Sequence, residues 1–383
     1  MKRTIIENSQ IWQEDTFITN HVIVTENGKI TEIMPQMDLM PEDDDNTIDA
    51  HGHYVIPGFV DVHIHGSNGF DTMDATQDAL QGLCDYLVTQ GVTTVLPTTM
   101  SDSDQHITNA LHAVTQFASR PNTPYAGVHL EGPYLNCDFR GSQPDTHLRA
   151  SKRDEYLKWF ESGQVRLITI APELENGDQL IRDARDHNIT VALGHSGATY
   201  EQAHHAFEVG LSQITHTFNG MVGIHHRQPG ALVAAFENPD ITFQIIPDGV
   251  HVHPATVNML VTLVGKERIV VITDAMRATG LADGHYQLGD VDVTVTAGEA
   301  RTSAGGLAGS TLTMPRALQN MMRFCKLSLA EVVPMMTRNS AQSIGLYPQK
   351  GSLNIGADAD IVIWDHDTGV QATLIGGEVV FQR

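Results

Sequence analysis

Two histidines at the end of an apolar segment, His63 and His65, could together bind a metal ion. The segment is rich in valine and isoleucine and runs into Gly66. Because side chains alternate along a β-strand, residues two apart project from the same face. Protein cores rarely place two imidazoles side by side unless a cation or polar partners satisfy them. The pair therefore indicates half of a metal site at a strand end.

Four further side chains of metal-binding type close other apolar runs. Imidazole nitrogen and carboxylate oxygen suit Zn²⁺ and similar divalent ions, and a site with open coordination positions is catalytic in type. Any one of the 20 histidines is most simply a surface or core residue. The same position at the ends of several strands instead favours a shared site, typical of a metal-dependent hydrolase. The predicted metal ligands are His63, His65, Glu131, His195, His216 and Asp274.

Asp274 follows a wholly apolar segment and is a candidate for proton transfer. Beside a bound cation, a carboxylate can take a proton from water that the cation has acidified and return it to a leaving group. The alternative is that Asp274 caps a following turn. The adjacent pairs at 204–205 and 225–226 are not included among the ligands, because neighbouring residues do not share a face.

Strand and helix patterns alternate through the middle of the chain and would bring these side chains together. Eight strand–helix units over roughly 290 residues match a (β/α)8 barrel, whose strand ends meet at one mouth. A doubly wound open sheet is the alternative, but it gives no reason for five strand ends to converge. The predicted strands are 55–65, 93–98, 125–131, 165–171, 190–195, 213–217, 242–247 and 268–274, and predicted helices include 76–90, 103–119, 177–187 and 199–209.

Both ends of the chain have a different, strand-rich character. Short strands flank an Asn27-Gly28 turn near the start, and others flank a Gly376-Gly377 turn near the end. We therefore expect an α/β fold in which a small β-sandwich, formed by residues 1–53 and 351–383, accompanies a TIM-like (β/α)8 barrel over 54–350. An alternating segment near 285–302 predicts a β-hairpin insertion, followed by two helices.

Charge and composition limit the partners. The 383 residues carry a formal net charge of −23, which argues against nucleic acid and anionic membranes, because both need a basic protein surface. No segment approaches the ~20 apolar residues of a membrane span. Cys84, Cys137 and Cys325 lack metal-binding or redox spacing, and their odd number disfavours a disulfide framework. The start lacks a signal-type apolar segment, so we expect a cytoplasmic protein.

Motifs built on these residues resemble those of the amidohydrolase superfamily and, more closely, of its N-acetylglucosamine-6-phosphate deacetylases. The resemblance covers essentially the whole chain. The His-x-His pair is common to the superfamily, whereas the Leu-Glu-Gly-Pro, Phe-Asn-x-Met and Asp-Gly-x-His blocks together are more specific. The motifs lie at residues 61–66, 129–133, 194–196, 215–221, 248–254, 273–276, 307–310, 350–353 and 356–360.

The resemblance implies a homodimeric enzyme that hydrolyses the acetamide of a 6-phosphorylated N-acetyl amino sugar. It assigns Asp274 to general acid–base catalysis, and it expects Zn²⁺, or else Fe²⁺, Mn²⁺ or Co²⁺. Because the His-x-His pair is intact, a second ion with a bridging Glu131 is expected beside the principal one. A non-catalytic relative would have lost ligands or the aspartate, and neither is lost here. The ligands that the resemblance gives to the principal metal are Glu131, His195 and His216.

The resemblance also implies the substrate contacts. Phosphate is expected near Asn219, Gly220 and Arg227, and the arginine is expected to reach the neighbouring subunit's site. A guanidinium suits this role because its fork binds phosphate oxygens bidentately. His251 is expected to contact sugar hydroxyls. The full predicted set is Ser142, Gln143, Asn219, Gly220, Arg227, Asp248, His251, Leu307, Ala308 and Gly309.

One motif departs from the family pattern. Where the family commonly has Gly-Ala-His, this chain has Gly141, Ser142 and Gln143. The histidine polarises the acetyl carbonyl, whereas Gln143 can donate a hydrogen bond but carries no charge. Oxyanion stabilisation would then depend on the metals or on Gln143 as a neutral donor. The resemblance favours hydrolysis of N-acetyl-D-glucosamine 6-phosphate to D-glucosamine 6-phosphate and acetate, and the galactosamine epimer or a different amide substrate is the alternative.

Overall fold

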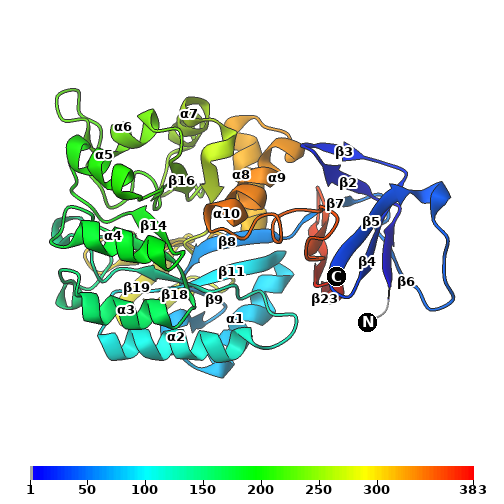
Figure 1. Cartoon of the computed structure of the whole chain (residues 1–383), viewed down its shortest axis with the longest axis horizontal. Helices are drawn as coiled ribbons and strands as arrows, with labels where there is room; N and C mark the ends of the chain where they lie inside the picture. The colour runs from blue at the N-terminus through cyan, green and yellow to red at the C-terminus, as the bar shows by residue number, and fades with distance from the viewer. Residues whose placement is uncertain (1–2) are drawn as a thin grey trace.

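A parallel barrel with its helices forms the left-hand part of the molecule in Figure 1, which shows a computed structural model that describes residues 3–383. Its sheet follows sequence order from β8 to β17, with every neighbouring pair parallel. The two end strands are joined just beyond β17, where the Asp274 amide donates to the His63 carbonyl over 2.9 Å. The barrel is therefore nearly closed, as predicted. Its strands are β8 (Phe59–Ile64), β11 (Val92–Thr99), β12 (Val128–Glu131), β13 (Val165–Ile170), β14 (Thr190–Leu193), β15 (Gln213–Ile214), β16 (Thr242–Ile245) and β17 (Ile269–Val271).

Helices follow most of the barrel strands and cover the outside of the barrel. The predicted helices at 76–90, 103–119, 177–187 and 199–209 are confirmed to within one residue at either end. Side-chain caps explain several starts: Thr76 and Ser103 each accept a hydrogen bond from a first-turn amide. Among the described residues, none of these helices is both long and apolar enough to cross a bilayer. The helices are α1 (Gln77–Thr89), α2 (Asp104–Ala118), α3 (Arg153–Glu161), α4 (Gly177–Asp186), α5 (Tyr200–Val209), α6 (Gly230–Glu237), α7 (Pro254–Val264), α8 (Met314–Cys325), α9 (Leu329–Met336) and α10 (Arg338–Ser343).

Strands from both ends of the chain form two sheets beside the barrel, in the part of the molecule where Figure 1 marks the C-terminus. One sheet has the order β5-β4-β1-β6, and the other has the order β23-β22-β21-β7-β2-β3. Apolar side chains of both sheets, such as Ile23 and Leu374, share one buried cluster. The predicted pairing of the terminal segments is therefore confirmed. These strands are β1 (Thr4–Glu7), β2 (Gln10–Gln13), β3 (Thr16–Ile18), β4 (His21–Glu26), β5 (Lys29–Pro35), β6 (Asn46–Asp49), β7 (Tyr54–Pro57), β21 (Ile361–Asp365), β22 (Gly369–Ile375) and β23 (Glu378–Gln382).

The predicted strand at 55–65 is wrong in one respect, because it is two strands in different sheets. β7 ends at Pro57 in the terminal sheet, and β8 starts the barrel at Phe59. Between them, the Gly58 amide donates to the Asp360 carbonyl over 2.9 Å. A Cβ on Gly58 would lie only 2.0 Å from Thr93 Oγ1. Glycine is thus required where the chain passes from the sandwich into the barrel.

The segment after the barrel also differs from the prediction. The insertion is an antiparallel sheet of three strands rather than a hairpin, and within residues 3–383 three helices follow it rather than two. Several barrel strands are shorter than predicted: β15 ends at Ile214, since His216 has a φ of 27° that a strand cannot continue. The remaining strands are β9 (Gly66–Ser67), β10 (Phe70–Asp71), β18 (Gly284–Leu288), β19 (Val291–Thr296) and β20 (Glu299–Thr302).

Gly58→Ala should destabilise the junction between the sandwich and the barrel. The added methyl group would overlap Thr93, and forcing an extra carbon into a packed core typically lowers the free energy of unfolding by about 1–3 kcal/mol. Gly223→Ala is a matched control, because nothing lies within 4 Å of its added Cβ. Urea unfolding of both variants measures the difference. Equal midpoints for the two variants would contradict this account of Gly58.

Candidate metal centre

All six predicted ligands lie at the carboxyl ends of barrel strands, inside one mouth. His63 is in β8 and Glu131 is the last residue of β12, while the other four follow their strands by one to three residues. All six are buried. Their nitrogen and oxygen atoms form two groups, each compact enough to hold one ion: His63, His65 and Asp274 in one, and Glu131, His195 and His216 in the other.

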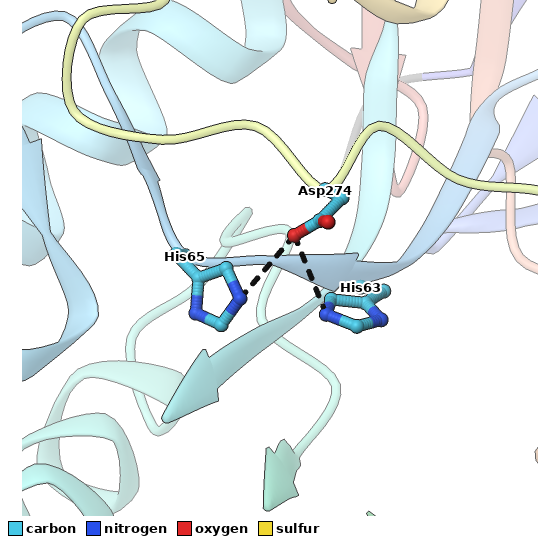
Figure 2. A group of neighbouring side chains, drawn as sticks. All are labelled: His63, His65 and Asp274. Atoms are coloured by element: carbon cyan, nitrogen blue, oxygen red, sulfur yellow. Dashed lines mark ion pairs between the residues drawn. The ribbon is translucent and has the colours of Figure 1, made fainter. Parts of the chain in front are cut away.

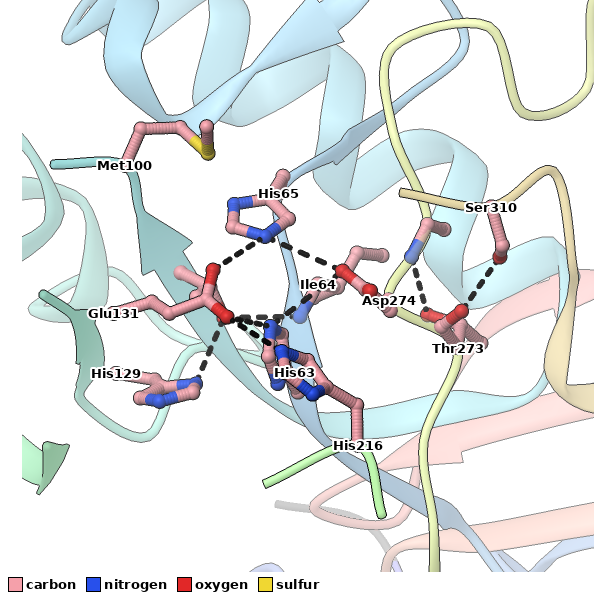
Figure 3. A network of polar contacts seen from close by, with 12 residues as sticks. His63, Ile64, His65, Met100, His129, Glu131, His216, Thr273, Asp274 and Ser310 are labelled. Carbon is pink, nitrogen blue, oxygen red and sulfur yellow. Dashed lines mark hydrogen bonds and ion pairs between the residues drawn. The ribbon is translucent and has the colours of Figure 1, made fainter. Parts of the chain in front are cut away.

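The Glu131 carboxylate lies between the two groups. Its Oε1 atom is 3.0 Å from His195 Nε2 and 3.1 Å from His216 Nε2. The same atom lies 3.6 Å from His63 Nε2, while Oε2 lies 3.2 Å from His65 Nε2. Figure 3 shows this carboxylate with His65 on one side and with His63 and His216 on the other. One carboxylate therefore faces four imidazoles, as a bridging ligand would.

Asp274 completes the group that contains the His-x-His pair. Its Oδ1 atom lies 3.5 Å from His63 Nε2 and 3.3 Å from His65 Nε2 (Figure 2). Burial alone would raise the pKa of Asp274, but the two histidines outweigh burial and lower the pKa below its ordinary value. Asp274 is therefore an ionised carboxylate at neutral pH, aimed at the same point as two imidazole nitrogens.

Three of the six residues have a backbone conformation that side-chain-bearing residues rarely adopt. φ is 48° at His195, 27° at His216 and 48° at Asp274. Such left-handed residues cost energy and persist where the surroundings hold them in place. At Asp274 the carbonyl accepts from the Ser310 amide over 2.7 Å. Each of these residues lies two or three positions beyond the end of its barrel strand and directs its side chain into the mouth.

Hydrogen bonds on the far side of two rings direct their Nε2 atoms inward. His63 Nδ1 is 3.0 Å from Gln244 Oε1, and His195 Nδ1 is 3.0 Å from the Phe139 carbonyl. Both partners only accept, so each Nδ1 carries a proton and leaves Nε2 as the nitrogen that can offer its lone pair to a cation. Within the described residues, His63 Nε2 is buried without a hydrogen-bond partner.

These lone pairs make the site fit a divalent cation. Unprotonated nitrogens that face carboxylate oxygens in a buried space repel them unless a proton or a metal ion lies between. Metal-bound histidines usually donate their other N–H to a backbone or side-chain acceptor, as His63 and His195 do here. Four imidazoles and two carboxylates suit Zn²⁺ or a similar ion.

A further buried network, which the sequence analysis missed, joins β8 to the end of β17. The Thr273 hydroxyl donates to Asp61 Oδ2 over 2.6 Å, and the Ser310 hydroxyl donates to the Thr273 carbonyl over 2.6 Å. Burial is the main cause that raises the pKa of Asp61, to about 6. This network supports the backbone next to Asp274. The sequence signal for this network was Asp61, a carboxylate between two valines in a predicted buried strand.

Two buried amides behind His63 were missed as well. Gln244 Oε1 accepts a hydrogen bond from His63 Nδ1, and Gln244 Nε2 donates one to Gln213 Oε1 over 2.6 Å. Both glutamines are fully buried in barrel strands. A polar residue within a predicted interior strand was the available signal, but it does not say which ring the amide would contact.

A cavity of about 280 Å³ opens in front of the two ligand groups. Most of the predicted substrate contacts line it, whereas Ala308, Asp248 and Arg227 do not. Ala308 is buried, and Asp248 lies behind His251 with its Oδ2 atom 2.7 Å from His251 Nδ1. Arg227 is exposed on a loop. The lining residues are His65, Glu131, Gly141, Ser142, Gln143, His195, His216, Asn219, Gly220, His251, Asp274, Leu288, Gly306, Leu307 and Gly309.

A larger hollow, of about 640 Å³, lies near the opposite ends of β14 and β15. Arg185, Thr190 and Ser212 are among the residues that line it, and none of the six candidate ligands is. In barrel enzymes the chemistry lies at the carboxyl ends of the strands. The smaller cavity is therefore the candidate substrate site.

Comparison with known proteins places these features in a family. The sequence matches the model of the amidohydrolase family over residues 54–380. It is 37% identical to N-acetylglucosamine-6-phosphate deacetylase of Vibrio furnissii over 97% of this chain and 92% of that protein. It is 34% identical to N-acetylgalactosamine-6-phosphate deacetylase of Escherichia coli O157:H7 over 98% of each. The solved structure of a mutant N-acetyl-D-glucosamine-6-phosphate deacetylase of Mycobacterium smegmatis, in complex with N-acetyl-D-glucosamine-6-phosphate, matches with a TM-score of 0.92 and 30% identity over 100% of both chains.

Metal binding should weaken as the pH falls. In the metal-free site burial lowers the pKa of His65, but hydrogen bonds with Asp274 and Glu131 outweigh it and raise the pKa to about 10. The ring therefore carries a proton at neutral pH, and a metal must displace it. We expect the dissociation constant for Zn²⁺, from chelator competition between about pH 8 and about pH 6, to rise about tenfold per pH unit for each displaced proton. His65→Gln should reduce by about one the number of protons released when Zn²⁺ binds, and so make the dissociation constant less dependent on pH. An affinity that does not change with pH would contradict the assignment of His65 as a metal ligand.

Proposed function

The chain belongs to the amidohydrolase family, and we propose that it hydrolyses the acetamide of N-acetyl-D-glucosamine 6-phosphate to D-glucosamine 6-phosphate and acetate. The observation that carries the proposal is the pair of ligand groups that share Glu131 at the floor of a cavity of about 280 Å³. The similarity to deacetylases over almost the whole chain supports the same reaction.

We propose that Glu131, His195 and His216 would hold the principal metal, that His63, His65 and Asp274 would hold a second ion, and that Glu131, which faces both groups, would serve both. Zn²⁺ is the proposed metal, and Fe²⁺, Mn²⁺ and Co²⁺ fit the same donors. A bound divalent ion supplies a Lewis acid that polarises the carbonyl and lowers the pKa of water. The protein fixes the donors before any ion arrives, through the Gln244 and Phe139 hydrogen bonds to the outer ring nitrogens.

Asp274 is the proposed general base and acid. Its carboxylate is ionised and borders the cavity, so it can accept a proton from the attacking water. Water adds to the acetyl carbon, the carbon–nitrogen bond breaks, and Asp274 returns the proton to the amine nitrogen. The left-handed backbone at Asp274 and the Ser310 amide hold the carboxylate in position through both transfers.

The sugar is proposed to bind between His251 on one side and Leu307 and Gly309 on another. His251 lies against Asp248, whose carboxylate fixes the orientation of the ring. Burial would lower the pKa of His251, but Asp248 outweighs it and raises the pKa. The ring therefore gains positive character, which suits it to donate hydrogen bonds to sugar hydroxyls.

The phosphate needs a cation that the cavity of one subunit does not provide. None of the lining residues is a lysine or an arginine. We propose that Asn219 and Gly220 contact the phosphate and that Arg227 from a second copy supplies the charge. The loop of Arg227 exposes Ile224, and Met259 on α7 is exposed as well. These apolar side chains support a homodimer.

The galactosamine epimer is the second candidate substrate. A relative named for that sugar is 34% identical to this chain, which lies within the 32–37% found for three bacterial glucosamine enzymes. Hydrolysis of a different amide is the third possibility. We also propose a cytoplasmic location, with which the three free cysteines are compatible.

Acetate release from four sugars tests the proposed function. N-acetylglucosamine 6-phosphate should be hydrolysed with the highest kcat/KM, followed by its galactosamine epimer, while the two unphosphorylated sugars should lose orders of magnitude because the phosphate contacts are absent. A chelator should abolish turnover, and added Zn²⁺ should restore it. Preference for the galactosamine sugar would select the second candidate; no acetate from any sugar would reject the deacetylase assignment.

Two variants that are each impaired at low substrate should complement each other if Arg227 serves the neighbouring site. Asp274→Asn is expected to retain its fold and to lose about 10²–10⁴-fold in kcat, because the proton acceptor is gone. Arg227→Ala should chiefly raise KM for phosphorylated sugar. When the two variants are unfolded together and refolded, mixed dimers contain one site with both native residues, and acetate release at low substrate should return.

A chain that carries both substitutions, refolded with wild type, is the control, since its mixed dimers contain no site with a native Asp274 and a native Arg227. Asp44→Asn, in the exposed 42–45 loop, controls for the loss of one carboxylate. Lack of recovery in the Asp274→Asn and Arg227→Ala mixture, with mixed dimers verified by mass, would contradict the exchange of Arg227 between subunits.

A further inference from the structure

Gln143 makes three contacts in the floor of the cavity and is only 2% exposed. Its Oε1 atom accepts a hydrogen bond from the Ser101 amide over 2.8 Å. Its Nε2 atom donates to Glu131 Oε2 over 2.8 Å and lies 3.7 Å from Met100 Sδ. The side chain therefore links the end of β11 to the carboxylate that faces both ligand groups.

The orientation of this amide follows from its neighbours. A backbone N–H can only donate, so Ser101 requires the oxygen of Gln143. At the other end of the amide, Glu131 Oε2 accepts from Gln143 Nε2 over 2.8 Å, while Glu131 Oε1 faces His195 and His216. Rotating the amide by half a turn would place its NH2 group against the Ser101 N–H and its oxygen against the Glu131 carboxylate. Neither pair could then form a hydrogen bond. Only one orientation satisfies both sides.

This orientation leaves no hydrogen for the substrate. The amide nitrogen carries two hydrogens. One is donated to Glu131 Oε2, and the other is directed to Met100 Sδ, a weak acceptor. To reach an acetyl oxygen, Gln143 would have to give up its hydrogen bond to a buried carboxylate, and hydrogen bonds to charged groups are among the stronger ones in proteins.

The loop that carries Gln143 also holds a second ligand. The Gln143 amide donates to the Arg140 carbonyl over 3.0 Å, which closes a tight turn. Just before this turn, the Phe139 carbonyl accepts a hydrogen bond from His195 Nδ1. A Cβ on Gly141 would lie 3.3 Å from His195 Cε1, so the loop packs directly on that ring. One loop thus contacts two of the three ligands in one group.

We propose that Gln143 is a positioning residue for Glu131 and does not donate to the oxyanion of the reaction. Its hydrogen bond fixes the rotation of the carboxylate, so that Oε1 faces His195 and His216 while Oε2 faces His65. The part of this inference that concerns the oxyanion rests on the proposed amide hydrolysis. The part that concerns Glu131 rests on metal binding alone.

Gln143→Met separates the two roles, because it keeps the length of the side chain and removes both amide groups. Loss of a hydrogen bond that orients a metal ligand typically weakens metal binding by about 10–100-fold, whereas loss of an oxyanion donor lowers kcat by about 10²–10³-fold. We expect the affinity for Zn²⁺, measured by competition with a chromophoric chelator, to fall at least tenfold. At saturating Zn²⁺, kcat should stay within about tenfold of wild type.

Unchanged Zn²⁺ affinity, or a kcat lowered a hundredfold or more at full metal occupancy, would overturn the proposal. Gln105→Met on the exposed face of α2 is the matched control and should alter neither quantity. Gln143→His is a second variant for the case in which Gln143→Met fails to fold. It retains one N–H for Glu131, so its Zn²⁺ affinity should stay within tenfold of wild type; a hundredfold loss would also overturn the proposal. Because the affinity is measured without substrate, it remains decisive even if the deacetylase assignment fails.

Discussion

The site depends on one buried carboxylate, Glu131, which faces four imidazoles. An unpaired carboxylate in a barrel interior is costly. The Glu131 carboxylate is tolerated because four imidazoles surround it, those of His63, His65, His195 and His216. The same contacts place nitrogen and oxygen donors close enough to share a cation. Any displacement of this carboxylate would alter both ligand groups, so the rest of the structure can be understood as the means of holding it in place.

Closure of the barrel provides much of that support. The Asp274 amide bonds to β8, and the Asp61–Thr273–Ser310 hydrogen bonds connect the two end strands of the sheet on the same side. The backbone energy stored at left-handed residues such as His216 is offset by the packing of the whole barrel. The outer nitrogen of His63 is satisfied by Gln244, so the ring cannot turn away without leaving a buried polar group unpaired.

The cavity in front of the ligand groups is bounded by this rigid floor and by the loops above it. His251, Leu307 and Gly309 border the cavity from loops that follow the barrel strands or the inserted sheet. The cavity holds two carboxylates and no lysine or arginine, within a chain whose net charge is −23. A phosphorylated ligand in this cavity would therefore depend on positive charge from bound metal or from the cavity histidines, and the proposed assembly would add Arg227 of a second copy.

Local patterns in the sequence were sufficient to predict the barrel, four of its helices and the gathering of six side chains of metal-binding type at one mouth, because strand alternation and polar residues at strand ends are properties of short segments. The division at Gly58 could not be predicted, since it depends on contact with Thr93, a residue distant in sequence. The direction of the Gln143 amide likewise follows from Ser101 and Glu131, which only folding brings together. The sequence by itself determined which donors exist and at which strand ends they stand. The tertiary structure alone decided which donors face one another, because distances between separate strands are set by barrel closure and loop packing.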